Sequence, residues 1–264
     1  MKKHIVTGLL ALLAFPALAQ QQFSTPEQAF SALTQAISSR DDARLGALLG
    51  ENWHQYLPPE GVDPEAVARY LRDWQVGHHI VVQGDSAHLL VGQENWQLPI
   101  PMEKTAGGWQ FDMAKAADEI QTREIGRNEL AAIGAMHAWV DAEHQYYQMN
   151  QQWAQKIVSS EGKKDGLYWP AQPGETPSPL GPGYSPTVPG MGYHGYRFRI
   201  IDDPQSSGVA LIAWPVSWGE SGVMSFMVNL DDKIYQANLG ETSAEKAAAV
   251  MQFSVAAPWE AVKE

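Results

Sequence analysis

The sequence has 264 residues, a formal net charge of −12 and no cysteine. This length suits one large domain or two smaller ones, each able to bury a core. The acidic balance argues against electrostatic binding to nucleic acid or anionic lipid, and the lack of cysteine excludes disulfides and thiol chemistry.

The first nineteen residues have the pattern of a secretory signal peptide. Two lysines at positions 2 and 3 precede an apolar run, 5–18, that is too short to span a bilayer comfortably. Ala17 and Ala19 are small residues at the two positions that signal peptidase requires, so we expect cleavage after Ala19. A buried helix is the alternative, but the glutamines at 20–22 end the apolar run abruptly. We therefore expect a periplasmic or secreted protein, without a lipid anchor on cysteine and without a later membrane segment.

Three helices are expected next. Thr25 can cap a helix whose apolar residues recur at helical spacing from Phe30 to Ile37. Asp41 predicts the start of a second, short helix, and Asp63 predicts a third that ends near residue 74.

From residue 79 the pattern changes to the alternation typical of strands. An antiparallel meander is expected over residues 79–83, 87–92, 96–102 and 109–112. Pro99 and Pro101 place its third strand at an edge or at a bulge, because proline lacks the amide N–H that a ladder needs. The order of helices followed by a curved antiparallel sheet, over residues 23–115, resembles the nuclear-transport-factor-two-like superfamily. The residues that carry this resemblance are 25–29, 41–45 and 107–111. The resemblance implies a scaffold and no particular chemistry.

The second half predicts a long helix, an irregular connection and a second sheet. A polar helical stretch at 114–123 is expected to precede a longer helix at 128–157. Prolines and glycines predict a long loop over 159–193. Strands follow at 196–201, 209–214, 223–229 and 234–237, with a short helix at 244–251. We therefore expect an α+β protein in which a module at 20–118 precedes a second module at 119–264.

Several motifs in this half resemble the exported bacterial family called domain of unknown function 2950. They include GKKDGLYWP at 162–170 and HGYRFRI at 194–200. The others lie at 125–133, 140–142, 213–215, 222–226, 235 and 239–240. The resemblance covers essentially the whole mature chain and implies a compartment, with no established activity.

Residues 128–240 also resemble the globular part of type IV pilins and secretion pseudopilins. In both, an alanine-rich helix with an Asp-Ala motif leads through a variable loop to a Gly-Tyr-x-Phe strand and an antiparallel sheet. This resemblance implies a long helix packed on a sheet. Filament assembly is not expected, because pilins polymerise through an apolar N-terminal helix that this chain replaces with a cleaved signal and a separate module.

A candidate surface for a ligand or partner combines rigid aromatic residues with charges. Its residues are Lys164, Asp165, Tyr168, Trp169, Trp214 and Trp218. The favoured interpretation of the first four is structural: Asp165 stabilises a turn, and Tyr168 and Trp169 close over the sheet. A phosphate loop is excluded, since the spaced glycines and the hydroxyl residue of a Walker sequence are missing.

His137, Asp141 and His144 lie on one face of the long predicted helix and form a weak candidate metal site, with Glu143 nearby. We expect no metal and no other cofactor, because a fourth ligand is missing. The favoured alternative is that Asp141 bonds buried backbone and the histidines form a polar border.

No catalytic residues are predicted. Residues 217–222 lack the Gly-x-Ser-x-Gly elbow of serine hydrolases, and the acid pairs at 202–203 and 231–232 fit turns. We therefore expect a binding protein whose partner is an envelope protein or a cell-wall component. One alternative is a hydrolase of an envelope polymer with a carboxylate pair at the domain junction. Another is an assembly factor that offers the edge of its second sheet to a partner strand.

Overall fold

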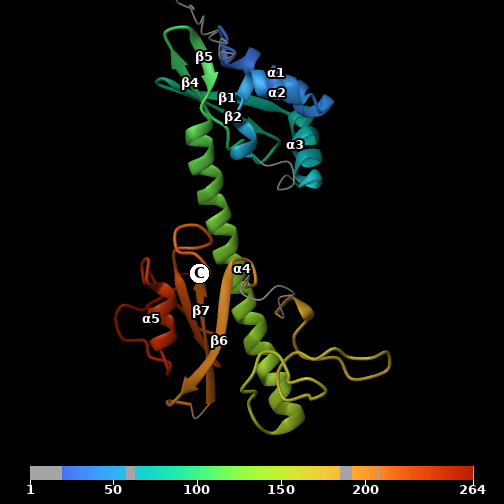
Figure 1. Ribbon diagram of the computed structural model, residues 1–264, viewed down its shortest axis with the longest axis vertical. Coiled ribbons are helices and arrows are strands. Elements are labelled where there is room, and N and C mark those ends of the chain that lie inside the picture. The colour runs from blue at the N-terminus through green and yellow to red at the C-terminus, as the bar shows by residue number, and fades with distance from the viewer. Residues whose placement is uncertain (1–19, 58–62, 185–191, 207, 264) are drawn as a thin grey trace, which may run out of the picture. The chain divides into compact units, whose positions relative to one another are not determined.

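A computed structural model describes residues 20–57, 63–184, 192–206 and 208–263 (Figure 1). The predicted signal peptide, 1–19, lies outside the described residues, as do positions 185–191 of the predicted loop. The fold is α+β: helices, a sheet, a long helix and a second sheet follow in that order. The chain divides into two compact units, Met1–Ile120 and Gln121–Glu264.

The helices of the first unit begin where the sequence predicts. They are α1 (Pro26–Ser39), α2 (Asp42–Leu49) and α3 (Pro64–Val76), with a short 3-10 turn, η1, at Trp53–Gln55. Side-chain oxygens of Thr25, Asp41 and Asp63 accept hydrogen bonds from the first free backbone N–H groups of the three α-helices. These caps satisfy donors that have no partner inside a helix.

The first sheet is antiparallel and has the strand order β1-β2-β4-β5, with β3 also paired to β2. Its strands are β1 (His78–Gln83), β2 (Ser86–Val91), β3 (Trp96–Gln97), β4 (Met102–Thr105) and β5 (Gly108–Phe111). The single third strand predicted at 96–102 is wrong, because β3 and β4 are separate. Pro99 and Pro101 lie between them and cannot donate to a ladder.

The long helix α4 (Met113–Asn150) is continuous, so the predicted break after residue 123 is wrong. The residues before 128 are polar, so the sequence does not show the helical pattern there. The segment contains no proline, and a Cβ on Gly126 would meet no atom within 4 Å. The predicted end at residue 157 is also wrong. Gln151 has φ 58°, a left-handed conformation that stops a helix, and its N–H donates to the Tyr147 carbonyl at 2.8 Å.

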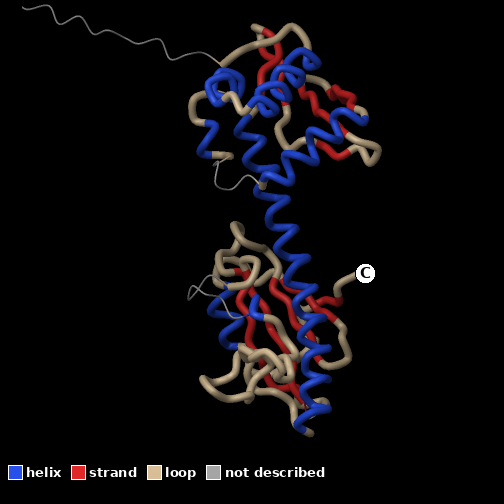
Figure 2. The backbone as a smooth tube through the Cα atoms, turned by 90° about the vertical axis from the view of Figure 1, so that its right-hand side faces the viewer, coloured by secondary structure: helices blue, strands red, loops and turns tan. Residues whose placement is uncertain are grey.

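The second sheet is antiparallel, with the order β10-β9-β8-β7-β6. Its strands are β6 (Tyr196–Asp203), β7 (Gly208–Pro215), β8 (Ser225–Asn229), β9 (Ile234–Ala237) and β10 (Glu260–Ala261). The four predicted strands are confirmed, and β10 is an addition. Figure 2 shows these strands gathered in one sheet beside α4. Apolar residues of α4 pack on one face, while α5 (Ser243–Ala249) covers the other.

The connection from 151 to 193 is irregular over its described part, apart from a 3-10 turn, η3, at Pro182–Tyr184. It is anchored by buried Leu167, Trp169 and Leu180, which join the core between α4 and the sheet. Stiff, proline-rich backbone therefore lies against the core and can hold side chains in fixed positions. Within the described residues, no helix has the length and apolar character that crossing a bilayer requires.

Candidate functional site

The predicted loop residues around Asp165 form a stabilised turn, as the structural interpretation expected. The Asp165 carboxylate accepts from the Ser160 backbone N–H at 2.7 Å and from Lys156 Nζ at 2.8 Å. These hydrogen bonds, first that of Lys156 and then that of the Ser160 backbone, hold the pKa of Asp165 well below its usual value. Lys164 Nζ lies 5.6 Å above the Trp169 ring and 3.6 Å from a Glu175 carboxylate oxygen.

The six residues of the predicted binding surface do not come together as one cluster. Tyr168 and Trp169 pack toward the core on the α4 face of the second sheet. Trp214 instead packs on the α5 face of the same sheet. Trp218 lies in the loop after β7, where its indole N–H donates to Asn238 Oδ1 at 3.0 Å. Partner binding by this set stays a prediction.

The candidate metal residues of α4 also point to different partners. His137 Nδ1 lies 2.7 Å from Asp232 Oδ1, and His144 Nε2 lies 3.3 Å from the Leu230 carbonyl oxygen. Over the described ranges, no three His, Cys, Asp or Glu side chains gather closely enough to hold a metal ion. Asp141 is exposed, so the expectation that it bonds buried backbone is wrong.

Glu143 is the buried acid of this helix, at 0% exposure. One of its oxygens accepts from the Ala154 backbone N–H at 2.9 Å, just beyond the helix end. The other oxygen has no hydrogen-bond partner among the described residues, and neither has the indole Nε1 of Trp139 one turn earlier. Burial raises the pKa of Glu143 to about 8. The carboxyl is therefore largely protonated at neutral pH.

The serine-rich loop after β7 is structural as well. Ser217 Oγ donates to Glu220 at 2.6 Å, and the Ser217 backbone N–H donates to Ser221 Oγ at 3.0 Å. Glu129 of α4 accepts the backbone N–H groups of Val223 and Met224, both at 2.9 Å. Glu129 thus ties the helix to the segment that leads into the sheet.

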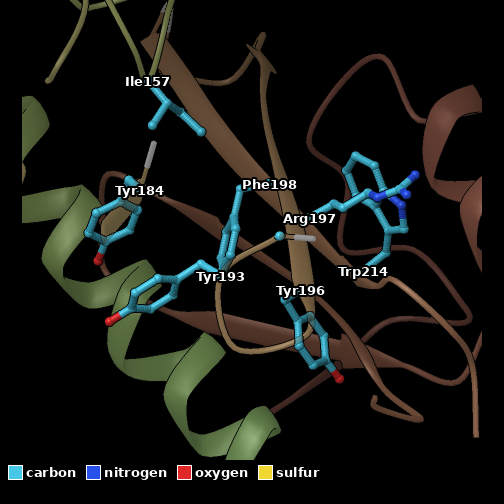
Figure 3. Close-up of a pocket in the computed structure, with 8 residues that line it drawn as sticks. Ile157, Tyr184, Tyr193, Tyr196, Arg197, Phe198 and Trp214 are labelled. Carbon is cyan, nitrogen blue, oxygen red and sulfur yellow. The ribbon is translucent and has the colours of Figure 1, made fainter. Parts of the chain in front are cut away.

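A cavity lined largely by aromatic residues lies in the described part of the second unit (Figure 3). This aromatic cavity has a volume of about 270 Å³. Its lining residues are Ile157, Tyr184, Gly192, Tyr193, Tyr196, Arg197, Phe198 and Trp214. The volume is slightly below the range of about 300 to 1,000 Å³ usual for small-molecule pockets, so the cavity suits one side chain or a small apolar group.

Aromatic rings fix the shape of the cavity. The rings of Tyr184 and Tyr193 are stacked, with centroids 5.0 Å apart and an angle of 12° between their planes. The Phe198 ring meets Tyr184 edge-on at 6.4 Å and lies 6.5 Å from Tyr193. Tyr184 is further held by a hydrogen bond of 3.2 Å from its hydroxyl to the Ala135 carbonyl of α4. The walls are therefore preorganised, which lowers the entropic cost of binding.

The two buried phenols of the aromatic cavity have raised pKa values. Burial, with a smaller contribution from Tyr193, raises the pKa of Tyr184 to about 12. Burial also raises the pKa of Tyr196 above its usual range, with a smaller contribution from Glu129. Both phenols are thus neutral at pH 7. Among the described lining residues there is no carboxylate and no histidine, and Arg197 is the one charged residue.

A tight turn between Tyr193 and Tyr196 places the rings. Gly192 and Gly195 have φ of 69° and 71°, left-handed values that strain other residues. A Cβ on Gly192 would overlap the Tyr196 carbonyl oxygen. This turn was not predicted as part of a site, although its Gly-Tyr-His-Gly-Tyr sequence combines two such glycines with aromatic residues. That combination is the signal by which it could have been found.

Fold and site together define a two-unit α+β protein with an apolar, aromatic cavity in its second unit. The chain belongs to the family described as "Protein of unknown function (DUF2950)", whose model matches residues 20–262. No curated protein and no solved structure matches the chain. The resemblances to pilins and to the nuclear-transport-factor-two-like superfamily therefore stay predictions.

Proposed function

We propose that the protein is an exported binding protein that holds an apolar or aromatic group of an envelope partner in the aromatic cavity. The observation that carries this proposal is the composition of the described cavity lining: stacked rings, one arginine and no carboxylate. An apolar cavity without acid–base groups favours binding, whereas a hydrolase needs a desolvated acid beside a second titrating group.

Export rests on the sequence of the first nineteen residues. The positively charged start, the short apolar run and the small residues before Gln20 support cleavage after Ala19. The family match begins at residue 20, which agrees with a mature chain that starts there. A periplasmic or secreted location would bring the cavity into contact with envelope proteins and cell-wall components. The pilin-like order of long helix, loop and antiparallel sheet is compatible with such a role.

Binding can be tested with small probes of defined chemistry. The full chain is titrated with N-acetylphenylalanine amide and N-acetylaspartate amide, and binding is followed by NMR chemical shifts of aromatic side chains. We expect the aromatic probe to bind and the acidic probe not to bind. Tyr184→Ala should weaken binding about tenfold, because a wall of the cavity is lost.

Tyr56→Ala is the matched control, since Tyr56 is an exposed tyrosine of the first unit. Equal affinities in wild type and Tyr184→Ala would contradict the proposal. Incubation of the chain with peptidoglycan and with an ester substrate tests the alternative hydrolase, and consumption of either would replace binding as the function.

A further inference from the structure

The helices α1 and α3 of the first unit (Figure 1) enclose a groove with a volume of about 560 Å³. This helix groove falls within the range of about 300 to 1,000 Å³ usual for small-molecule sites. Both of its walls consist of described helical residues, and the α3 wall begins at Leu71, about 10 Å along the helix axis from Pro64. The groove is separate from the aromatic cavity, which belongs to the second unit.

The α1 wall of the helix groove presents hydroxyl and amide side chains. They are Ser31, Thr34, Gln35, Ser38 and Ser39. These positions recur every three or four residues, so they share one face of the helix. Residues 28–39 contain no charged side chain, although 18% of the residues of the chain are charged. Serine and threonine form helices less readily than lysine or glutamate, so helix stability does not explain this composition.

The floor of the helix groove is the hydroxyl of Thr34, which is only 7% exposed. Thr34 Oγ1 donates its one hydrogen to the Phe30 carbonyl at 2.8 Å. The hydrogen bond of 2.6 Å between Thr34 and the Tyr70 hydroxyl must therefore be donated by Tyr70. With its hydrogen already used, the Thr34 oxygen can only accept a further bond, which favours a ligand that donates.

The α3 wall adds an aromatic ring. Trp74 is half-buried, and its ring is stacked on that of His78, with centroids 3.6 Å apart and an angle of 8° between the planes. This stacking holds the indole in one position beside the polar face of α1. An indole has apolar C–H surface and a polar edge, so it suits a ligand that carries both C–H and O–H groups.

The helix groove is close to neutral. Arg72 is the one charged residue among its described lining residues, and Asp73 offsets that charge. Arg72 Nε donates to Asp73 Oδ1 at 3.0 Å, and a terminal guanidinium nitrogen lies 2.9 Å from the same oxygen. The exposed side chains that form no hydrogen bond with other described residues are Ser31, Gln35, Ser38 and Gln75. The polar groups open to a ligand are therefore uncharged.

We infer that the helix groove binds an uncharged oligosaccharide, whose hydroxyl groups pair with the serine, threonine and glutamine side chains and whose ring C–H groups pack on Trp74. Hydroxyl and amide groups both donate and accept hydrogen bonds, as sugar hydroxyls do. The wall from Ser31 to Ser39 is about 12 Å long, which suits several linked sugar rings. An apolar helix is a poorer occupant, because it would bury these polar groups without partners.

This inference concerns a second site and does not depend on the aromatic cavity. The first test is isothermal titration of the full chain with cellotriose, maltotriose and triacetylchitotriose. At least one should bind with a Kd near about 1 mM, since an open groove gives modest affinity, so titration to about 10 mM is sufficient. Trigalacturonate, an acidic trisaccharide, should bind at least fivefold more weakly than the best neutral sugar. Equal or tighter binding of trigalacturonate would overturn the assignment of an uncharged ligand.

Fluorine NMR of the full chain labelled with fluorotryptophan locates the bound sugar. The Trp74 resonance is identified by its loss in Trp74→Phe. It should shift as the sugar is added, with the same midpoint as the calorimetric titration. A sugar that binds without moving this resonance occupies another site, and that result would also overturn the inference.

Variants of the two walls give a third readout. Ser38→Leu puts an apolar side chain into the helix groove and should weaken sugar binding about tenfold, while leucine, a better helix former than serine, preserves α1. Joint replacement of Gln35 and Gln75 by alanine should weaken binding about fivefold, because hydrogen bonds to the sugar are lost.

Ser254→Leu is the matched control, since Ser254 is an exposed serine of the second unit. It should bind the sugar like wild type, and so should Tyr184→Ala, which alters the aromatic cavity instead. The inference fails if none of the three neutral sugars binds, or if Ser38→Leu binds as tightly as wild type. A loss of sugar binding in Tyr184→Ala alone would assign the sugar to the aromatic cavity and refute the helix groove.

Discussion

Replacing Glu143 by glutamine should change how the stability of the protein depends on pH. Burial raises the pKa of this carboxyl from 4.5 to about 8, so the folded state holds its proton more tightly than the unfolded chain. The resulting stabilisation is complete below about pH 4.5 and is lost as pH rises to about 8. At about 1.4 kcal/mol per pKa unit, the free energy of unfolding should fall by roughly 3 to 5 kcal/mol across that window.

Glu143→Gln keeps an oxygen that can accept the Ala154 N–H but cannot ionise. We expect it to be about 1 kcal/mol less stable than wild type at pH 5, because the new amide N–H groups are buried without partners. At pH 9 it should be more stable than wild type by a few kcal/mol. Urea unfolding between pH 5 and 9, followed by tryptophan fluorescence, measures both differences.

Asp141→Asn is the matched control, because Asp141 is an exposed acid of the same helix. It should leave the pH dependence of wild type unchanged. The reasoning is refuted if the stability of wild type is flat from pH 5 to 9, or if Glu143→Gln retains the slope of wild type. Either result would mean that the carboxyl is hydrated or paired in the folded protein.

Three further substitutions test local packing and hydrogen bonding. Asp165→Asn should lower the midpoint of thermal unfolding at pH 7, and this effect should shrink as pH falls below 3.8; the pKa of Asp165 is lowered, so its contribution is complete above the unfolded value of 3.8 and is lost as pH falls toward the pKa of the folded state. Gly222→Ala places a methyl group on the Tyr196 hydroxyl and should cost about 1 to 3 kcal/mol in urea unfolding. Thr34→Val removes the buried hydrogen bond of 2.6 Å to the Tyr70 hydroxyl and should cost about 1 to 3 kcal/mol, and a double-mutant cycle with Tyr70→Phe should show coupling.

The parts of the fold that depend on local chemistry could be predicted from the sequence. Thr25, Asp41 and Asp63 announce helix starts because short polar side chains satisfy free N–H groups, and the structure contains those caps. The beginning of α4 could not be predicted in this way, because its polar residues show no apolar stripe. The strand β10 has two residues, too few to show alternation.

The candidate site was harder to predict for a different reason. Asp165 was recognised as the centre of a turn because its partners lie within nine positions of it in the sequence. The aromatic cavity instead combines Ile157 and Tyr184 from the irregular connection with Phe198 from a strand. No local pattern indicates that rings from such segments stack. In addition, Glu143 lies in the core and Asp141 is exposed. Which of the two acids is buried depends on the rotation of α4 about its axis against the sheet.

The pairings at the two ends of β6 have a consequence for colloidal behaviour. A long bare edge would let chain after chain add strands, as in amyloid growth. Here Tyr193 at one end and the segment 251–253 at the other already pair with β6. A concentrated solution of this protein should therefore resist fibril formation by strand addition at this edge.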